Sequence, residues 1–131
     1  MKIISKEMLI KGLVDHPPYE SNPELLAKVN FIYHSPDGRM AMAYYESPEG
    51  WFDVEVNGFD EIDYILEGNV ELISDKQRLT AKSGDCFWIE DGDKFRWQMN
   101  EPSKMIFFIH SLSEEIQEFI SQFMSDCHKE S

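Results

Sequence analysis

The sequence predicts an all-β domain that folds as a sandwich or barrel of short antiparallel strands. Turn-forming residues recur about every ten positions, a spacing typical of short strands joined by tight connections. The segments between these turns are rich in β-branched and aromatic residues, and no long helical pattern separates them. The predicted strands are Val29–His34, Met40–Glu46, Trp51–Val56, Asp60–Leu66, Val70–Ile73, Arg78–Ala81, Cys86–Ile89, Phe95–Met99 and Met105–His110.

Glycine, proline, asparagine and aspartate lie between these strands, at the places where tight turns are expected. The Ser-Pro-Asp-Gly sequence at 35–38 and the Ser-Pro-Glu-Gly sequence at 47–50 separate the first three strands. Such residues adopt positive φ, fix φ or bond to their own backbone, so each favours a chain reversal. No repeat or low-complexity linker divides the chain, and we expect one domain over 1–131 with a barrel core over about 29–110.

The composition favours a packed globule and excludes some classes of partner. Apolar residues make up 42% of the 131 positions, enough for one core that buries roughly two thirds of the unfolded surface. The net charge of −13 disfavours nucleic acid and anionic membrane surfaces as partners. Cys86 and Cys127 do not form a disulfide framework, and no apolar segment is long enough to span a bilayer. We expect a soluble cytoplasmic protein.

Helices are predicted on both sides of the barrel segment. Ser5 can cap a short helix to about Val14, and the Asn-Pro-Glu sequence at 22–24 is typical of one more helical turn. At the carboxyl end, Ser111 and Glu114 form a capping box that predicts a helix over about 112–127. Its apolar stripe comprises Ile116, Phe119, Ile120, Phe123, Met124 and Cys127. This stripe covers the outside of its own barrel or contributes to a dimer interface, and the sequence leaves both open.

Two motifs carry a resemblance to a known superfamily. Glu61 is separated by six residues from Gly68, and a Gly-Asp pair at 84–85 is followed by Gly92, eight residues beyond Gly84. This arrangement resembles that of the cupins. The wider segment over about 40–112 resembles the ethanolamine-utilisation protein Q family, although Glu90 stands where that family usually has proline and 51–58 differs in residue choice. The resemblance implies a cupin double-stranded β-helix, a jelly-roll-like barrel, and a homodimer, because cupins commonly pair.

The resemblance also implies two functions of different classes. Proteins of this family are assigned acetate kinase activity, which implies phosphoryl transfer from ATP to acetate, with Glu61, Asp63 and Glu55 holding Mg²⁺ against the phosphates. The alternative is a non-catalytic binding or scaffolding module that contacts microcompartment proteins. The only nearby cationic candidates are Lys82, Lys94 and Arg96, and Arg96 is expected to point outward. We assign no catalytic residue.

The chain lacks the histidines that metal-binding cupins use as ligands. No histidine occurs between His34 and His110, and Phe95 stands at the histidine position of the second motif. Only Glu61 remains as a residue of ligand type. A tight transition-metal site requires imidazole or thiolate ligands, so we expect no tightly bound metal, and oxygen donors suit at most a weakly held Mg²⁺.

Counting back from Glu61 gives two candidate pairs for the first two histidine positions. With three intervening residues the pair is Glu55 and Asn57, and with four it is Val54 and Val56. The sequence does not decide between them.

Strand alternation predicts that two carboxylates face the barrel interior. Glu61 and Asp63 lie two residues apart on one face, about 7 Å from each other at ordinary strand rise. This separation allows an acid–base pair or a clamp on an ammonium group, and the like charges raise one pKa. Alternatively, Asp63 only fixes the barrel through hydrogen bonds. We expect a small polar metabolite to be bound by Glu55, Asn57, Glu61, Asp63, Phe95 and Trp97.

Overall fold

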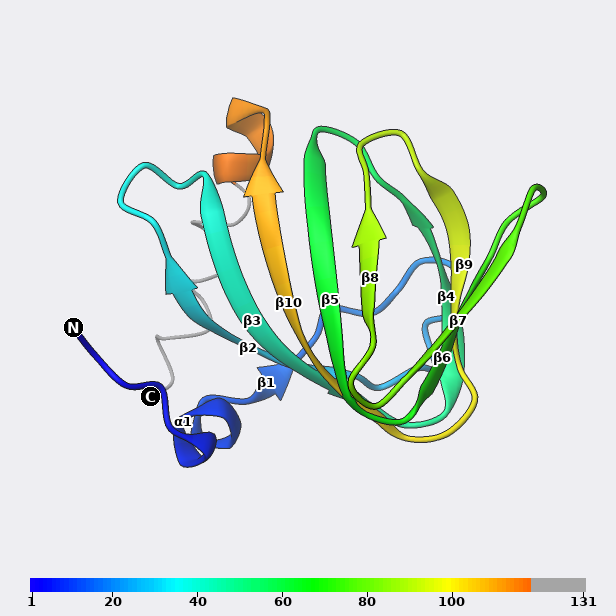
Figure 1. Cartoon of the computed structure of the whole chain (residues 1–131), viewed down its shortest axis with the longest axis horizontal. Helices are drawn as coiled ribbons and strands as arrows, with labels where there is room; N and C mark the ends of the chain where they lie inside the picture. Colours follow the sequence, from blue (N-terminus) through cyan, green and yellow to red (C-terminus); the bar gives the residue numbers. More distant parts are fainter. Residues whose placement is uncertain (119–131) are drawn as a thin grey trace.

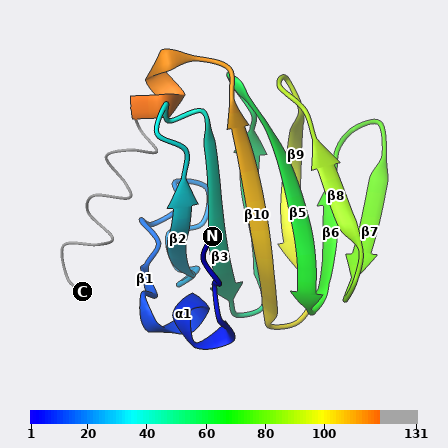
Figure 2. The same ribbon diagram turned by 60° about the vertical axis from the view of Figure 1, so that its left-hand side comes forward.

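The computed structural model describes residues 1–118 and contains two antiparallel sheets that face one another (Figure 1). The larger sheet has the strand order β1-β2-β3-β10-β5-β8, and the smaller has the order β4-β9-β6-β7. Figure 2 shows the strands of the larger sheet side by side, with the helix α1 beside β1 and β2. The elements are α1 Lys6–Lys11, β1 Val14–Asp15, β2 Lys28–His34, β3 Met40–Ser47, β4 Gly50–Glu55, β5 Phe59–Glu67, β6 Asn69–Ile73, β7 Arg78–Lys82, β8 Cys86–Ile89, β9 Lys94–Met99 and β10 Ser103–Ser111.

All nine predicted strands are confirmed, with ends that differ from the prediction by at most two residues. The turns between them also fall where glycine was expected to permit positive φ. Gly68 joins β5 to β6 with a φ of 115°, and a side chain there would also collide with Ser103. The two sheets bury a single core between them, and Val29, Ile65 and Val70 are fully enclosed in it.

The amino-terminal helix begins as predicted but ends earlier. The Ser5 hydroxyl accepts a hydrogen bond from the Met8 backbone N–H at 3.3 Å, so Ser5 is the N-cap. The helix stops at Lys11 because Asn30 of β2 donates side-chain hydrogen bonds to the backbone carbonyls of Met8 and Leu9, both at 3.0 Å. These bonds satisfy carbonyls that a helix end otherwise leaves open.

Beyond this helix the chain forms β1, a strand that the sequence did not predict. Val14 pairs with Val29 of β2 in an antiparallel register. The predicted helical extent to Val14 is therefore wrong, since this residue belongs to the edge of the larger sheet.

The prediction of one more helical turn at residues 22–24 is also wrong, because this segment forms a non-helical turn. The Asn22 backbone N–H bonds to the carbonyl of Tyr19, and the Asn22 side-chain amide donates to the carbonyl of Trp51 at 2.9 Å. Next to it, the Ser21 hydroxyl accepts from the Asp53 backbone N–H at 2.9 Å. These bonds hold the segment against the edge strand β4, and it does not form a helix.

The carboxyl-terminal helix has its cap two residues later than predicted, at Ser113 instead of Ser111. Residues 114–118 are helical, and the Ser113 hydroxyl accepts from the backbone N–H of Ile116 at 3.3 Å. Ser111 is still part of β10, and its hydroxyl donates to the Ser113 carbonyl at 3.1 Å. Ile116 packs against the core, whereas the predicted continuation over 119–127 lies outside the described residues.

Candidate binding site in the barrel

The two carboxylates predicted to face the interior do so. Glu61 and Asp63 alternate along β5 on the same face as the fully buried Ile65. Asp63 is only 1% exposed, while its neighbour Ile62, on the opposite face, is 47% exposed. The period of two in β5 therefore brings a pair of acidic side chains into the barrel, as the sequence predicted.

The two carboxyl groups interact with each other through a hydrogen bond. Burial raises the pKa of Asp63 well above its usual range, and the negative charge of Glu61 and the hydrogen bond raise it further. Burial also raises the pKa of Glu61, but the hydrogen bond from Asp63 opposes this shift. Asp63 is accordingly the partner that keeps a proton, and the pair titrates together.

One oxygen of this pair and one indole nitrogen have no hydrogen-bond partner among the described residues. They are Asp63 Oδ2 and Trp97 Nε1, and both are buried. Asp63 lies directly opposite Phe87 in the β5–β8 pairing, and the Phe87 ring is 5.8 Å from the Trp97 ring. An unsatisfied buried polar group costs about 1–3 kcal/mol, so a molecule that bonds to these atoms would stabilise the fold.

A series of stacked rings leads from Trp97 toward the barrel wall. The Phe52 ring lies 6.0 Å from Trp97, and the Tyr19 ring stacks on Phe52 at 3.9 Å. The Tyr19 and Tyr45 hydroxyls are 2.8 Å apart and share a hydrogen bond. Burial raises the pKa of Tyr45 to about 12, and it raises that of Tyr19 further, with an added contribution from the charge of Glu61. The Tyr19 hydroxyl is thus within electrostatic reach of the carboxyl pair.

Sequence reasoning missed this aromatic contribution from the segment before β2. His16 stacks on Tyr19 with ring centroids 4.5 Å apart, and burial lowers the pKa of His16. Neither residue lies in a periodic element, so no pattern placed them at the barrel. The one available signal was the density of aromatic and proline residues at 16–19, which is typical of a packed irregular segment.

The remaining predicted site residues separate into two groups. Phe95 lies on the inner face of β9, directly opposite Val54. Glu55 and Asn57, by contrast, are exposed and do not join Glu61 and Asp63. The alternation of β4 explains this difference, because Val54 packs against the core while its neighbour Glu55 points the other way. Val56 is buried just beyond the strand.

Of the two candidate pairs, the one with four residues before Glu61, Val54 and Val56, therefore occupies the inward positions. The carboxyl pair is then accompanied at these positions by Val54, Val56 and Phe95, none of which can bind a metal. Such a set does not fit a tightly held transition metal. Within residues 1–118, no three histidine, cysteine, aspartate or glutamate side chains come together as a group that could hold an ion.

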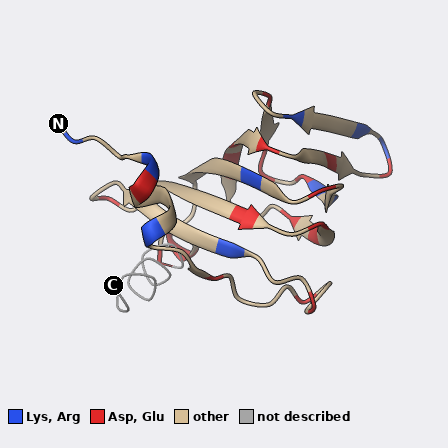
Figure 3. Ribbon diagram, turned by 90° about the horizontal axis from the view of Figure 1, so that it is seen from below, with Lys and Arg blue, Asp and Glu red and all other residues tan. Residues whose placement is uncertain are grey.

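Cationic side chains lie outside the barrel. Every lysine and arginine within residues 1–118 is exposed, and Figure 3 shows these positions interspersed with acidic ones along strands and turns. Arg96 points outward, as predicted. Its guanidinium bonds to Asp53 at 2.8 Å and lies 4.0 Å from the centre of the Trp51 ring. The hydrogen bond from Arg96 lowers the pKa of Asp53.

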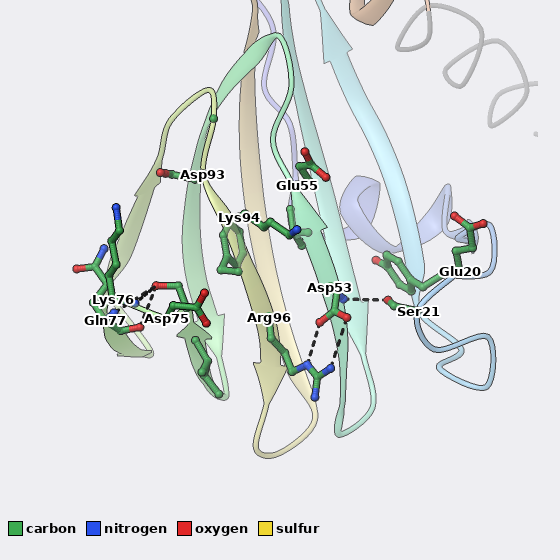
Figure 4. Close-up of a pocket in the computed structure, with 16 residues that line it drawn as sticks. Glu20, Ser21, Asp53, Glu55, Asp75, Lys76, Gln77, Asp93, Lys94 and Arg96 are labelled. Atoms are coloured by element: carbon green, nitrogen blue, oxygen red, sulfur yellow. Dashed lines mark hydrogen bonds and ion pairs between the residues drawn. The ribbon is translucent and has the colours of Figure 1, made fainter.

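A groove of about 980 Å³ runs beside these outward groups. Figure 4 shows Asp53 and Arg96 paired between two flanks, with Glu20 and Ser21 on one side and the turn at 75–77 on the other. Tyr19 also lines the groove. Val54 and Phe95, which pack against the core from β4 and β9, line the groove as well.

A family model described as "Ethanolamine utilisation protein EutQ" matches residues 13–113. The chain belongs to the EutQ family. A curated relative from Clostridioides difficile (strain 630), described as "Acetate kinase EutQ", is 30% identical over 69 residues, which is 53% of this chain and 43% of that protein. The match thus spans less than half the length of this relative.

Solved structures support the same family and show the cupin fold. The Clostridium difficile EutQ protein is 26% identical, with a TM-score of 0.62 over 70% of this chain and 73% of that one. A putative EutQ from Salmonella typhimurium LT2 is 20% identical, with a TM-score of 0.64 over 73% and 78%. A predicted oxalate decarboxylase from Thermotoga maritima is 15% identical, with a TM-score of 0.67 over 85% and 100%, and like the Salmonella protein it shows the fold alone. Within the described residues, no helix is long and apolar enough to cross a membrane.

Proposed function

We propose that this EutQ-family cupin binds a small polar metabolite of ethanolamine utilisation inside its barrel. The observation that carries this proposal is the pair of buried atoms, Asp63 Oδ2 and Trp97 Nε1, that have no partner among the described residues. Buried polar side chains in native proteins are nearly always hydrogen-bonded, and the exceptions require an explanation. A bound molecule that reaches both atoms supplies one.

The two atoms define the chemistry of the ligand. The indole N–H of Trp97 can only donate, so the ligand needs an acceptor oxygen. Asp63 Oδ2 calls for a donor, and an ammonium or hydroxyl group supplies it. The rings of Phe52, Phe87 and Trp97 provide an apolar and π-rich wall that favours a cation next to short methylene groups. A small amino alcohol combines all these features, and ethanolamine is the natural first probe.

The experiment is isothermal titration calorimetry of the full chain with ethanolamine, other short amino alcohols, acetate and sugars. We expect an amino alcohol to bind to the wild type, and Glu61→Gln to weaken binding about tenfold or more while costing little stability. Glu55→Gln is the matched control, because Glu55 is exposed outside the barrel, and it should bind as the wild type does.

Elemental analysis of the purified protein completes the test. Failure of every compound to bind, or equal binding by Glu61→Gln and the wild type, contradicts a carboxylate pocket. So does a stoichiometric zinc or iron that Glu61→Gln removes.

Phosphoryl transfer from ATP–Mg²⁺ to acetate is the second candidate, and the name of the curated relative suggests it. Such transfer needs cations to stabilise the phosphates. The exposed groove suits this reaction better than the barrel interior does. Lys76, Lys94 and Arg96 line the groove beside carboxylates that could share a Mg²⁺. Acetyl phosphate formation from ATP and acetate, measured in the wild type and in Lys94→Gln, separates the two candidates. Activity that depends on Lys94 but not on Glu61 assigns the reaction to the groove.

A scaffolding role in a microcompartment is a third proposal and rests on family membership. Co-purification of the full chain with shell proteins or ethanolamine-degrading enzymes would support it. The net charge of −13 favours partners that present a basic surface.

A further inference from the structure

Besides the carboxyl pair and the Trp97 nitrogen, the barrel encloses two tyrosine hydroxyls that bond to each other. Tyr45 belongs to β3 and is 4% exposed, and its hydroxyl is 2.8 Å from that of Tyr19. The Tyr19 ring stacks on Phe52 of β4 with centroids 3.9 Å apart, so Tyr19 contacts one strand of each sheet. The hydroxyl pair therefore lies where the two sheets meet.

The protons of this pair are directed away from Tyr19. Burial raises the pKa of both tyrosines, and their shared bond raises that of Tyr19 while it lowers that of Tyr45, as expected when Tyr19 is the donor. Ser47 also bonds to Tyr45 and gives its own proton to the carbonyl of Pro48 at 3.0 Å, so it is left to accept from Tyr45. The Tyr19 oxygen remains an acceptor, because no other group among residues 1–118 bonds to it.

This acceptor oxygen lies near the two buried atoms that need a partner. After burial and the bond to Tyr45, the charge of Glu61 contributes to the raised pKa of Tyr19, so this hydroxyl is within electrostatic reach of β5. On its other side, the rings of Tyr19, Phe52 and Trp97 are stacked in series. Facing sheets pack about 10 Å apart, so a ligand of about four non-hydrogen atoms can reach groups on both of them.

The position of Tyr19 is fixed although it lies in an irregular segment. The His16 ring stacks on its ring with centroids 4.5 Å apart. The backbone N–H of Asn22 bonds to the Tyr19 carbonyl at 3.1 Å, and the Asn22 side chain donates to the carbonyl of Trp51 at 2.9 Å. A group that recognises a ligand must be held by its neighbours in this way.

We infer that Tyr19 determines the specificity of the barrel for a ligand that carries a hydroxyl group. This hydroxyl donates to the Tyr19 oxygen and accepts from the Trp97 N–H, while the ammonium group of the ligand bonds to Asp63 Oδ2. A hydroxyl can do both at once, whereas a methyl group in its place can do neither. The inference rests on the proposed binding of an amino alcohol and adds the residue that selects the alcohol. Tyr45 is a positioning residue, because it acts through Tyr19.

The experiment is calorimetric titration of the full chain with ethanolamine and ethylamine, two cations that differ only in the hydroxyl. We expect the wild type to prefer ethanolamine by at least about tenfold, because ethylamine leaves the buried Trp97 N–H unpaired. Tyr19→Phe keeps the ring that stacks on Phe52 and removes only its hydroxyl. This variant should bind ethanolamine about five- to tenfold more weakly and ethylamine within about twofold of the wild type.

Tyr64→Phe is the matched control. Tyr64 lies on the outer face of β5 and is 38% exposed, so this variant should bind both amines as the wild type does. Tyr45→Phe removes the group that orients the Tyr19 hydroxyl, and it should lower the preference for ethanolamine by a smaller factor. Thermal melts verify that the variants fold. If Tyr19→Phe does not, Tyr45→Phe decides the test, and an unchanged preference overturns the inference.

Failure of the inference can be told apart from failure of the proposed function. If no amine binds to the wild type, the barrel site is wrong and the inference falls with it. If both amines bind but the wild type does not prefer ethanolamine, or if Tyr19→Phe keeps the full preference, the barrel site stands and the role of Tyr19 is overturned. An equal loss of affinity for both amines in Tyr19→Phe also overturns it, since such a loss shows a structural role alone.

Discussion

The two faces of β5 invert the usual distribution of polar and apolar side chains. Facing the barrel, this strand carries the carboxyl groups of Glu61 and Asp63 among the packed core residues. Facing outward, it carries Ile62 and Tyr64, both of which are exposed. A buried polar group and an exposed apolar patch are the two departures from ordinary burial that indicate function. Both departures occur on this one strand, the polar one on its inner face and the apolar one on its outer face.

The largest expected effect compares the two isoleucines of this strand. Ile65 is fully buried between the sheets, whereas Ile62 is 47% exposed on the outer face. We expect Ile65→Ala to lower the free energy of unfolding by about 2–5 kcal/mol, through lost burial and an unfilled cavity. Ile62→Ala should cost less than about 1 kcal/mol at concentrations where the protein is monomeric. Urea denaturation of both variants measures the difference, and similar losses would show that the outer face is already covered.

The second-largest effect is expected on the pH dependence of stability, through the buried carboxyl group of Asp63. Because folding raises the pKa of Asp63, the folded state binds its proton more tightly than the unfolded state does. The stability that this proton contributes is complete below about pH 4, the ordinary pKa of an aspartate. Between that pKa and the raised pKa of the folded state, it falls by about 1.4 kcal/mol for each pH unit. We expect Asp63→Asn to be more stable than the wild type at neutral pH and to lose this advantage near about pH 4.

Urea denaturation of the wild type and Asp63→Asn between about pH 4 and pH 8 measures this dependence. Glu55→Gln serves as the exposed control and should follow the wild type. A difference between wild type and Asp63→Asn that does not change with pH would mean that Asp63 keeps its ordinary pKa in the fold.

A smaller effect is expected from the unpartnered indole nitrogen. Trp97→Phe keeps an aromatic ring in the core but removes the buried N–H that has no partner among the described residues. The gain from deleting this donor offsets part of the loss of ring contacts, so we expect a cost below the roughly 3–5 kcal/mol of a full truncation to alanine. Affinity for the amino alcohol should fall several-fold, and calorimetry that gives unchanged affinity would remove Trp97 from the site.

The smallest effect is expected on the outer surface of the smaller sheet. Arg96→Gln removes an exposed ion pair with Asp53, and exposed pairs contribute little to stability. The melting temperature should stay nearly unchanged while the pKa of Asp53 rises toward its ordinary value, which NMR titration can follow. Binding to the barrel should be unaffected, and a lost ligand response would show that the groove and the barrel form one site.

The barrel was predictable because its signals are local and periodic. Turn residues mark the strand ends, and the period of two along β5 places Glu61 and Asp63 inside without further information. The choice between Glu55 and Val54 could not be made in the same way. That choice depends on the number of residues between β4 and β5. Only the packing of Val54 against the core shows which residue faces inward.

The parts of the site that come from irregular segments were not predictable. Tyr19 reaches the barrel because Asn22 bonds to the carbonyl of Trp51 and because β1 pairs with β2, and neither contact leaves a pattern in the sequence. The error at Ser111 has a related cause. Ser111 and Ser113 both have a suitable hydroxyl, and the length of β10 decides which of them caps the helix.

The bonds that Ser21 and Asn22 make to β4 also bear on aggregation. They occupy a backbone N–H and a carbonyl on this edge of the smaller sheet, where another chain could otherwise add a strand. The opposite edge strand among the described residues is β7, which carries Arg78 and Lys82 at its two ends. Charges at such positions discourage cross-β stacking. One edge of the sheet is thus blocked by side chains and the other by charge, which should keep concentrated protein from forming fibrils.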